Sequence, residues 1–97
     1  VMHDRAIARL TLETELRRAL LNHPEEFVLY YQPIIDLQTA EVRGFEALVR
    51  WQHPKRGTIM PGDFISVAEE TGLIVPLSYW LLELACSQMA TWQHNYT

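Results

Sequence analysis

The segment GFEALVRW, residues 44–51, decides the fold expected for this chain. It alternates apolar residues with others and carries only two charges, which is typical of a strand. Because successive side chains of a strand point to opposite faces, Glu46, Leu48 and Arg50 lie together on one face. The opposite face is expected to take a layer of helices, since it is entirely apolar and carries Phe45, Ala47, Val49 and Trp51.

The face that carries Glu46, Leu48 and Arg50, called the mixed face below, has two interpretations. In the first, it is exposed to solvent, and Glu46 and Arg50 form a weak pair along the strand with little energetic value. In the second, it faces the interior end of a barrel, where a carboxylate can hold a divalent cation and a guanidinium can hold a phosphate. The pattern alone leaves both interpretations open.

A second strand is expected over residues 27–35, FVLYYQPII, which are apolar on both faces, as in a strand covered on both sides. Pro33 has no N–H for the ladder, so it is expected near the strand end or on an edge. Gln32 is either a polar edge residue or a hydrogen-bonding group for a ligand. The connection over residues 36–41 is too short for a helical crossover, which predicts that this strand pairs antiparallel with residues 42–51.

The first helix is expected over residues 4–21, where apolar residues recur at spacings near 3.6. Its charged residues mostly occupy the other sides and are expected to face solvent. Asp4 is the expected N-cap. The segment Asn22-His23-Pro24 is expected to end this helix, because proline disfavours helical geometry in the residue before it.

Residues 53–62, HPKRGTIMPG, are expected to form a loop because they contain two prolines and two glycines. A short helix is predicted over residues 63–71, with Gly72 as its C-terminal stop. Its inward-facing residues are expected to be Phe64, Ile65 and Ala68. Pro76 is expected to open a longer helix. The apolar stripe of that helix predicts core packing and consists of Leu77, Trp80, Leu81, Leu84, Ala85, Met89 and Trp92.

The composition of the 97 residues narrows the possible functions. The formal net charge is −4 and the basic residues are scattered, which argues against binding to a nucleic-acid polymer. Cys86 is the single cysteine, so no internal disulfide is possible, and its apolar helical surroundings predict a buried, inert thiol. No segment reaches the ~20 apolar residues that span a bilayer, and no secretion signal is evident. We therefore expect a cytoplasmic location, although the parent protein could be membrane-tethered through other domains.

Several of these segments, in order and correctly spaced, resemble the opening of the EAL domain family. They are YQPIID at residues 31–36, GFEALVRW at 44–51, His53-Pro54, PGDFI at 61–65 and AEETGLI at 68–74. The tripeptide that names the family is Glu46-Ala47-Leu48. The resemblance implies an α/β fold: the N-terminal fragment of a modified (β/α)₈ TIM-type barrel with an antiparallel first strand. A complete barrel needs ~250 residues.

The resemblance also implies a domain organisation. Residues 1–22 would form an interdomain or leading helix, and residues 23–97 the first part of a truncated EAL domain. The helix itself, with Met2-His3, Ala6, Arg9-Leu10 and Leu12-Glu13, resembles the connection found where a GGDEF domain precedes an EAL domain. An upstream GGDEF domain is therefore expected in the parent protein.

The activity implied by the resemblance is hydrolysis of cyclic-di-GMP to linear pGpG by water activated with Mg²⁺ or Mn²⁺. Glu46 would be a metal ligand, Gln32 would contact the substrate, Leu48 would pack against it and Arg50 would bind a phosphate. The other acidic ligands of the family are absent from this sequence. We therefore expect no complete catalytic set in the fragment, no metal bound by it and no activity from it alone.

Two further expectations follow. The alternative function is a degenerate EAL domain that binds cyclic-di-GMP or a protein partner without hydrolysis. The fragment is also expected to self-associate, because two strands with apolar faces and open edges need cover.

Overall fold

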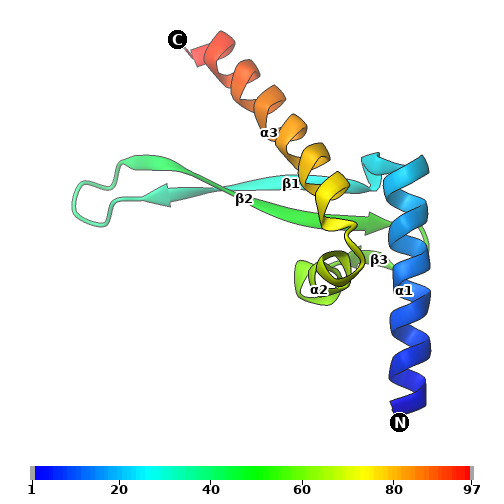
Figure 1. Ribbon diagram of the computed structural model, residues 1–97. Helices are drawn as coiled ribbons and strands as arrows, with labels where there is room; N and C mark the ends of the chain where they lie inside the picture. Colours follow the sequence, from blue (N-terminus) through cyan, green and yellow to red (C-terminus); the bar gives the residue numbers. More distant parts are fainter. Residues whose placement is uncertain (1, 97) are drawn as a thin grey trace.

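The computed structural model describes the backbone of residues 2–96 and the side chains of residues 3–93. This part of the chain is an α/β unit in which a three-stranded sheet lies among three α-helices (Figure 1). None of the helices described is long and apolar enough to cross a membrane. The elements in chain order are α1 (Met2–Asn22), the 3₁₀ turn η1 (Pro24–Glu26), β1 (Phe27–Ile35), β2 (Val42–His53), β3 (Gly57–Ile59), α2 (Pro61–Thr71) and α3 (Ile74–Tyr96).

Strands β1 and β2 form a long antiparallel hairpin, as the short connection predicted. The register starts at Phe27 opposite Trp51 and runs to Ile34 opposite Gly44, where a bulge follows. The hairpin extends well past the helices as a twisted ribbon (Figure 1). In its turn, the guanidinium of Arg43 lies 2.7 Å from an Asp36 carboxylate oxygen, and this hydrogen bond lowers the pKa of Asp36.

The core lies at the end of the hairpin away from this turn. Phe27 stacks on Trp51 with ring centroids 5.1 Å apart, and Phe64 of α2 packs against both rings. All three side chains are fully buried, and aromatic contacts of this kind add to the free energy gained from apolar burial. Each helix contributes to the same cluster; its other fully buried members are Leu16 and Ala19 of α1, Ala68 of α2 and Leu77 of α3.

Helix α3 covers the apolar face of the hairpin, which confirms the helical layer expected there. The indole N–H of Trp80 donates to the Phe27 carbonyl over 3.1 Å. Further along the helix, Trp92 contacts the rings of Tyr31 and Phe45, with centroids 5.0 and 4.8 Å away. Most of the predicted apolar stripe of α3 is therefore at least partly buried, but Met89 is 56% exposed, so its predicted place in the core is wrong. The mixed face lies on the side of the hairpin opposite to this helix.

The helix boundaries differ from the prediction in two places. Helix α1 already includes Met2, so the expectation that Asp4 is an N-cap is wrong; Asp4 lies in the first turn, where a carboxylate suits the helix dipole. Helix α3 begins at Ile74, so Pro76 lies within its first turn, where a missing N–H costs no hydrogen bond. Gly72 ends α2 with φ 80°, as predicted.

The segment expected to be a loop contains a strand. β2 continues to His53, and β3 returns along it with Trp51 opposite Ile59 and His53 opposite Gly57. A strand of three residues that begins with glycine is too short to show an alternating pattern, so it could not be predicted from the sequence.

Two further burial predictions are wrong for the described part of the chain. Cys86 is exposed, because the side of α3 that contacts the sheet carries Trp80 and Leu84 and the thiol lies on another side. Strand β1 is covered on one face only, since Tyr30 and Ile34 are each 51% exposed. The apolar character of residues 27–35 therefore exceeds what the described helices can cover.

Candidate functional site

The four residues singled out from the sequence lie on one face of the hairpin. Gln32 on β1 is the direct cross-strand partner of Glu46 on β2. Opposite residues of an antiparallel pair share a face, with Cβ atoms about 5 Å apart. Leu48 and Arg50 follow on the same face at period two. The structure therefore brings together a carboxylate, an amide, an apolar side chain and a guanidinium.

Glu46 and Gln32 present their polar groups to the outside of the described structure. Both residues are exposed, and neither side chain hydrogen-bonds to any residue that the structure describes. The weak Glu46–Arg50 pair of the first interpretation does not form among these residues. Instead, Arg50 is half-buried and donates from Nη1 to the carbonyl of Val49 over 2.7 Å. The carboxylate is thus available to an external cation.

The acidic groups on this face do not make a metal site by themselves. Within the described residues, no group of three or more His, Cys, Asp or Glu side chains could hold a metal ion. Hard divalent cations take about six or more oxygen ligands, several of which the protein usually supplies. Glu46 can therefore be one ligand of such an ion, and further ligands would have to come from outside this part of the chain.

A short row of hydrogen-bonded polar residues continues the mixed face, and the sequence analysis missed it. The amide of Gln52 donates to the Tyr30 hydroxyl over 2.6 Å, and Thr58 of β3 donates to the same amide's oxygen over 2.7 Å. Gln52 lies two positions after Arg50, so the period of the strand could have placed it there. Thr58 could not have been found, because β3 was not expected.

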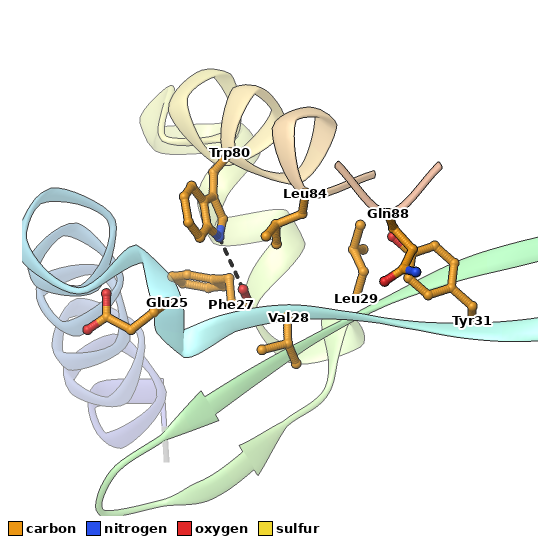
Figure 2. A pocket seen from close by; sticks show the side chains of 8 residues that line it. All are labelled: Glu25, Phe27, Val28, Leu29, Tyr31, Trp80, Leu84 and Gln88. Atoms are coloured by element: carbon orange, nitrogen blue, oxygen red, sulfur yellow. Dashed lines mark hydrogen bonds between the residues drawn. The ribbon is translucent and has the colours of Figure 1, made fainter. Parts of the chain in front are cut away.

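One pocket of the described structure lies away from the mixed face. It is a groove of about 260 Å³ between β1 and α3, and it contains none of the four predicted residues. Figure 2 shows its lining, which consists of Glu25, Phe27, Val28, Leu29, Tyr31, Trp80, Leu84 and Gln88. Its walls are mainly apolar, and the Trp80 indole closes one side through its bond to the Phe27 carbonyl (Figure 2). The groove therefore offers little of the chemistry present on the mixed face.

Comparison with known proteins decides the family. Residues 13–97 match the family model of the EAL domain. The chain belongs to the EAL domain family. The expected fold class, the first part of the α/β barrel of this family, is thereby confirmed together with the family.

Curated EAL relatives match almost the whole chain. The cyclic di-GMP phosphodiesterase PdeR of Escherichia coli K12 is 51% identical over 92 residues, which cover 95% of this chain and 14% of PdeR. MucR of Pseudomonas aeruginosa, a bifunctional diguanylate cyclase and cyclic di-GMP phosphodiesterase, is 44% identical over 91 residues, which cover 94% of this chain and 13% of MucR. The EAL chain thus spans a small part of these relatives.

Solved EAL structures share its fold. The MucR phosphodiesterase in complex with c-di-GMP superposes with a TM-score of 0.81 and 43% identity, covering 89% of this chain and 34% of that one. The cGMP-bound EAL enzyme Bd1971 superposes with a TM-score of 0.81 and 33% identity. The match covers 95% of this chain and 24% of the Bd1971 chain. The β1–β2 hairpin and its helices are therefore an arrangement that other EAL structures share.

Proposed function

We propose that this chain is the leading part of a cyclic-di-GMP phosphodiesterase, which hydrolyses cyclic-di-GMP to linear pGpG in bacterial second-messenger signalling. One observation carries the proposal: Gln32, Glu46, Leu48 and Arg50 occupy one open face in a chain 51% identical to a named phosphodiesterase. The separation of this face from the helical layer supports it, because a substrate can approach there without displacing the core.

Glu46 is proposed as a ligand of Mg²⁺ or Mn²⁺. Its carboxylate is exposed and has no partner among the described residues, so binding a cation would break no existing contact. When bound, such an ion polarises a phosphoryl oxygen and lowers the pKa of a coordinated water. The chain supplies one carboxylate to this chemistry, and the complete ligand set belongs to the whole domain.

The remaining three residues are proposed to hold the substrate. Arg50 would turn its planar guanidinium from the Val49 carbonyl to a phosphate, which it can bind through two parallel hydrogen bonds. Gln32 would offer its amide beside the metal ligand, and Leu48 would pack against an apolar surface of the substrate. These roles agree with the order of the side chains along the face.

The fragment by itself is proposed to be inactive, because one carboxylate cannot position a catalytic cation. The test measures release of pGpG from cyclic-di-GMP with Mg²⁺ or Mn²⁺, using the 97-residue chain and the complete domain of its parent protein. We expect turnover only from the complete domain. Metal-dependent turnover by the short chain, above that of its Glu46→Ala variant, would show that the inactivity proposal is wrong. Binding of cyclic-di-GMP by the complete domain without turnover would instead identify a degenerate, receptor-type EAL domain.

The proposal extends to the partners and the location of the parent protein. The parent protein is proposed to be cytoplasmic and to carry an upstream GGDEF domain, since MucR combines diguanylate cyclase and phosphodiesterase activities. Helix α1 would then be the connection between the two domains.

The isolated chain is proposed to self-associate. Strand β1 pairs only with β2 in the described structure, and Tyr30, Ile34 and Ile35 beside its open edge are each 51% exposed. Exposed strand edges are templates for pairing with another chain. Analytical ultracentrifugation at increasing concentration should reveal dimers or larger species, and a strictly monomeric folded chain would contradict this proposal.

A further inference from the structure

His53 is a buried polar side chain at the end of β2, with 5% of its surface exposed. Its Nε2 atom lies 2.6 Å from a carboxylate oxygen of Glu15 on α1. Its Nδ1 atom lies 3.0 Å from the backbone nitrogens of both Lys55 and Arg56. Because a backbone N–H can only donate, Nδ1 must accept both bonds and carry no hydrogen. The hydrogen is then on Nε2, which donates it to Glu15, so these contacts fix one tautomer.

A second connection joins the same helix to the same strand end. The guanidinium of Arg18 on α1 binds Glu26 of η1 through two hydrogen bonds of 3.0 Å, in a bidentate arrangement. The other partner of Glu26 is Trp51 of β2, whose indole N–H donates to it over 3.0 Å. The Arg18 hydrogen bond lowers the pKa of Glu26, so its carboxylate remains charged in this position.

These two connections close into a ring of five residues: Glu15, Arg18, Glu26, Trp51 and His53, called the clasp below. Arg18 Nε lies 3.5 Å from Glu15, and the Trp51 and His53 rings are 5.5 Å apart between centroids. Glu15 and Arg18 are three positions apart on α1, which places them on one side of the helix. A rotation of α1 by one residue, about 100°, would remove both from the clasp at once.

The clasp holds the strand that carries the mixed face. Trp51 and His53 end the same strand that holds Glu46, Leu48 and Arg50. Elsewhere in the described structure, α1 is held by the apolar, non-directional packing of Leu16 and Ala19 and by the exposed ion pair between Arg9 and Glu70 of α2. Directional bonds between α1 and β2 are therefore concentrated at the clasp.

We infer that the clasp couples the position of helix α1 to the end of β2, with His53 as the positioning residue that also fixes the turn to β3. Displacement or rotation of α1 is transmitted through Glu15 and Arg18 to the strand end. The inference rests on the geometry of the clasp and stands independently of whether the parent protein hydrolyses cyclic-di-GMP.

Amide hydrogen exchange tests this coupling in the 97-residue chain. In Glu15→Ala, the Nε2–H of His53 loses its acceptor, so the imidazole is no longer restricted to one tautomer. The backbone N–H groups of Lys55 and Arg56 then lose Nδ1 as a constant hydrogen-bond acceptor. We expect these two amides, which lie in the turn between β2 and β3 and not on α1, to exchange about tenfold faster, as for the loss of one hydrogen bond. The matched control is Glu13→Ala on the same helix, whose carboxylate has only a 3.7 Å contact with Arg17. It should change the two rates by less than about twofold.

Two further measurements separate coupling from general loss of structure. The Leu29 amide of β1 serves as reference; a rise in exchange that is equal at Lys55, Arg56 and Leu29 would assign Glu15 a purely structural role and overturn the inference. The ¹⁵N chemical shifts of the His53 ring in the unmodified chain should show hydrogen on Nε2 and none on Nδ1. A hydrogen on Nδ1 in the unmodified chain would by itself overturn the inference. Glu15→Gln retains an acceptor oxygen and should preserve both the tautomer and the slow exchange.

Discussion

Gln32 and Glu46 are direct partners across the β1–β2 ladder, on the face of the hairpin that α3 leaves open. Neither side chain has a partner among the described residues, although the same face carries the bonded row of Tyr30, Gln52 and Thr58. Because both groups are exposed and hold no internal bond, they can bind a ligand without breaking an existing contact. The pair therefore lies in the part of the face where the proposed metal ligand and a proposed substrate-binding residue are neighbours.

The first prediction concerns this pair in the complete domain of the parent protein. Glu46→Gln keeps the size of the side chain but removes the charge, so metal affinity and cyclic-di-GMP turnover should each fall at least tenfold. Even substitutions of residues that only orient a metal ligand reduce metal affinity or activity about 10–100-fold. Isothermal titration with Mn²⁺ and an assay of pGpG release measure the two effects.

The control for this prediction is Glu41→Gln, because Glu41 is an exposed carboxylate in the hairpin turn. It should leave metal affinity and turnover within about twofold of the unmodified domain, as expected for a surface change with no ligand role. Equal losses in both variants would remove Glu46 from the proposed metal site.

The second prediction concerns Arg50. Lysine keeps the positive charge but cannot form two parallel hydrogen bonds with a phosphate, so Arg50→Lys should weaken cyclic-di-GMP binding by about tenfold. The measurement is equilibrium binding to the complete domain in Ca²⁺, with turnover recorded separately in Mg²⁺. Arg43→Lys is the matched control, because Arg43 pairs with Asp36 in the hairpin turn, away from the mixed face. Unchanged affinity in Arg50→Lys would contradict a phosphate-binding role.

The sequence predicts those features of the structure that depend on neighbouring residues in the chain. Residues 27–35 form the expected strand with both boundaries correct, because aromatic and β-branched residues recur through it and polar residues bound it. The mixed face was predictable from period two alone. Gly72 was recognisable as a helix stop because left-handed backbone geometry favours glycine.

Other features depend on contacts that no local pattern encodes. His53 looked like part of a loop, yet it is buried because Glu15, far away in the sequence, supplies the acceptor for its ring. Cys86 looked buried because α3 is apolar on more than one side, with Tyr79 and Leu82 exposed as well. Strand β3 exists only because β2 extends two residues further than expected and offers it an edge. In each case a tertiary contact overrides the local pattern.

The third prediction concerns stability in acid. Hydrogen bonds from His53 to Glu15, and from Arg18 to Glu26, lower the pKa of each carboxyl group in the folded chain. A group whose pKa is lower in the folded than in the unfolded state contributes stability that is complete above the unfolded value and is lost as the pH falls through the folded one. The urea concentration at the midpoint of unfolding should therefore decrease as the pH is lowered from 6 to 3.

The variant Glu26→Gln isolates one of these contributions. It should be less stable than the unmodified chain at pH 6, because Arg18 loses its bidentate partner. The difference between the two proteins should shrink as the pH falls, because the unmodified Glu26 becomes neutral as well. A difference that stays constant from pH 6 to pH 3 would show that the Glu26 charge does not stabilise the fold.

The fourth prediction concerns the junction between α2 and α3. Gly72 has φ 80°, and a Cβ atom built there would meet no heavy atom within 4 Å. The cost of Gly72→Ala is therefore conformational and not steric, and it should be about 1–2 kcal/mol in the free energy of unfolding.

The matched control is Gly62→Ala in the first turn of α2, where the space is equally open and φ is not positive. Alanine there should stabilise the chain by about 0.4–1 kcal/mol, because it restricts the unfolded state and favours the helix. Urea unfolding measures the change in the free energy of unfolding, which should be negative for Gly72→Ala and positive for Gly62→Ala. Destabilisation of equal size at both positions would contradict the conformational explanation.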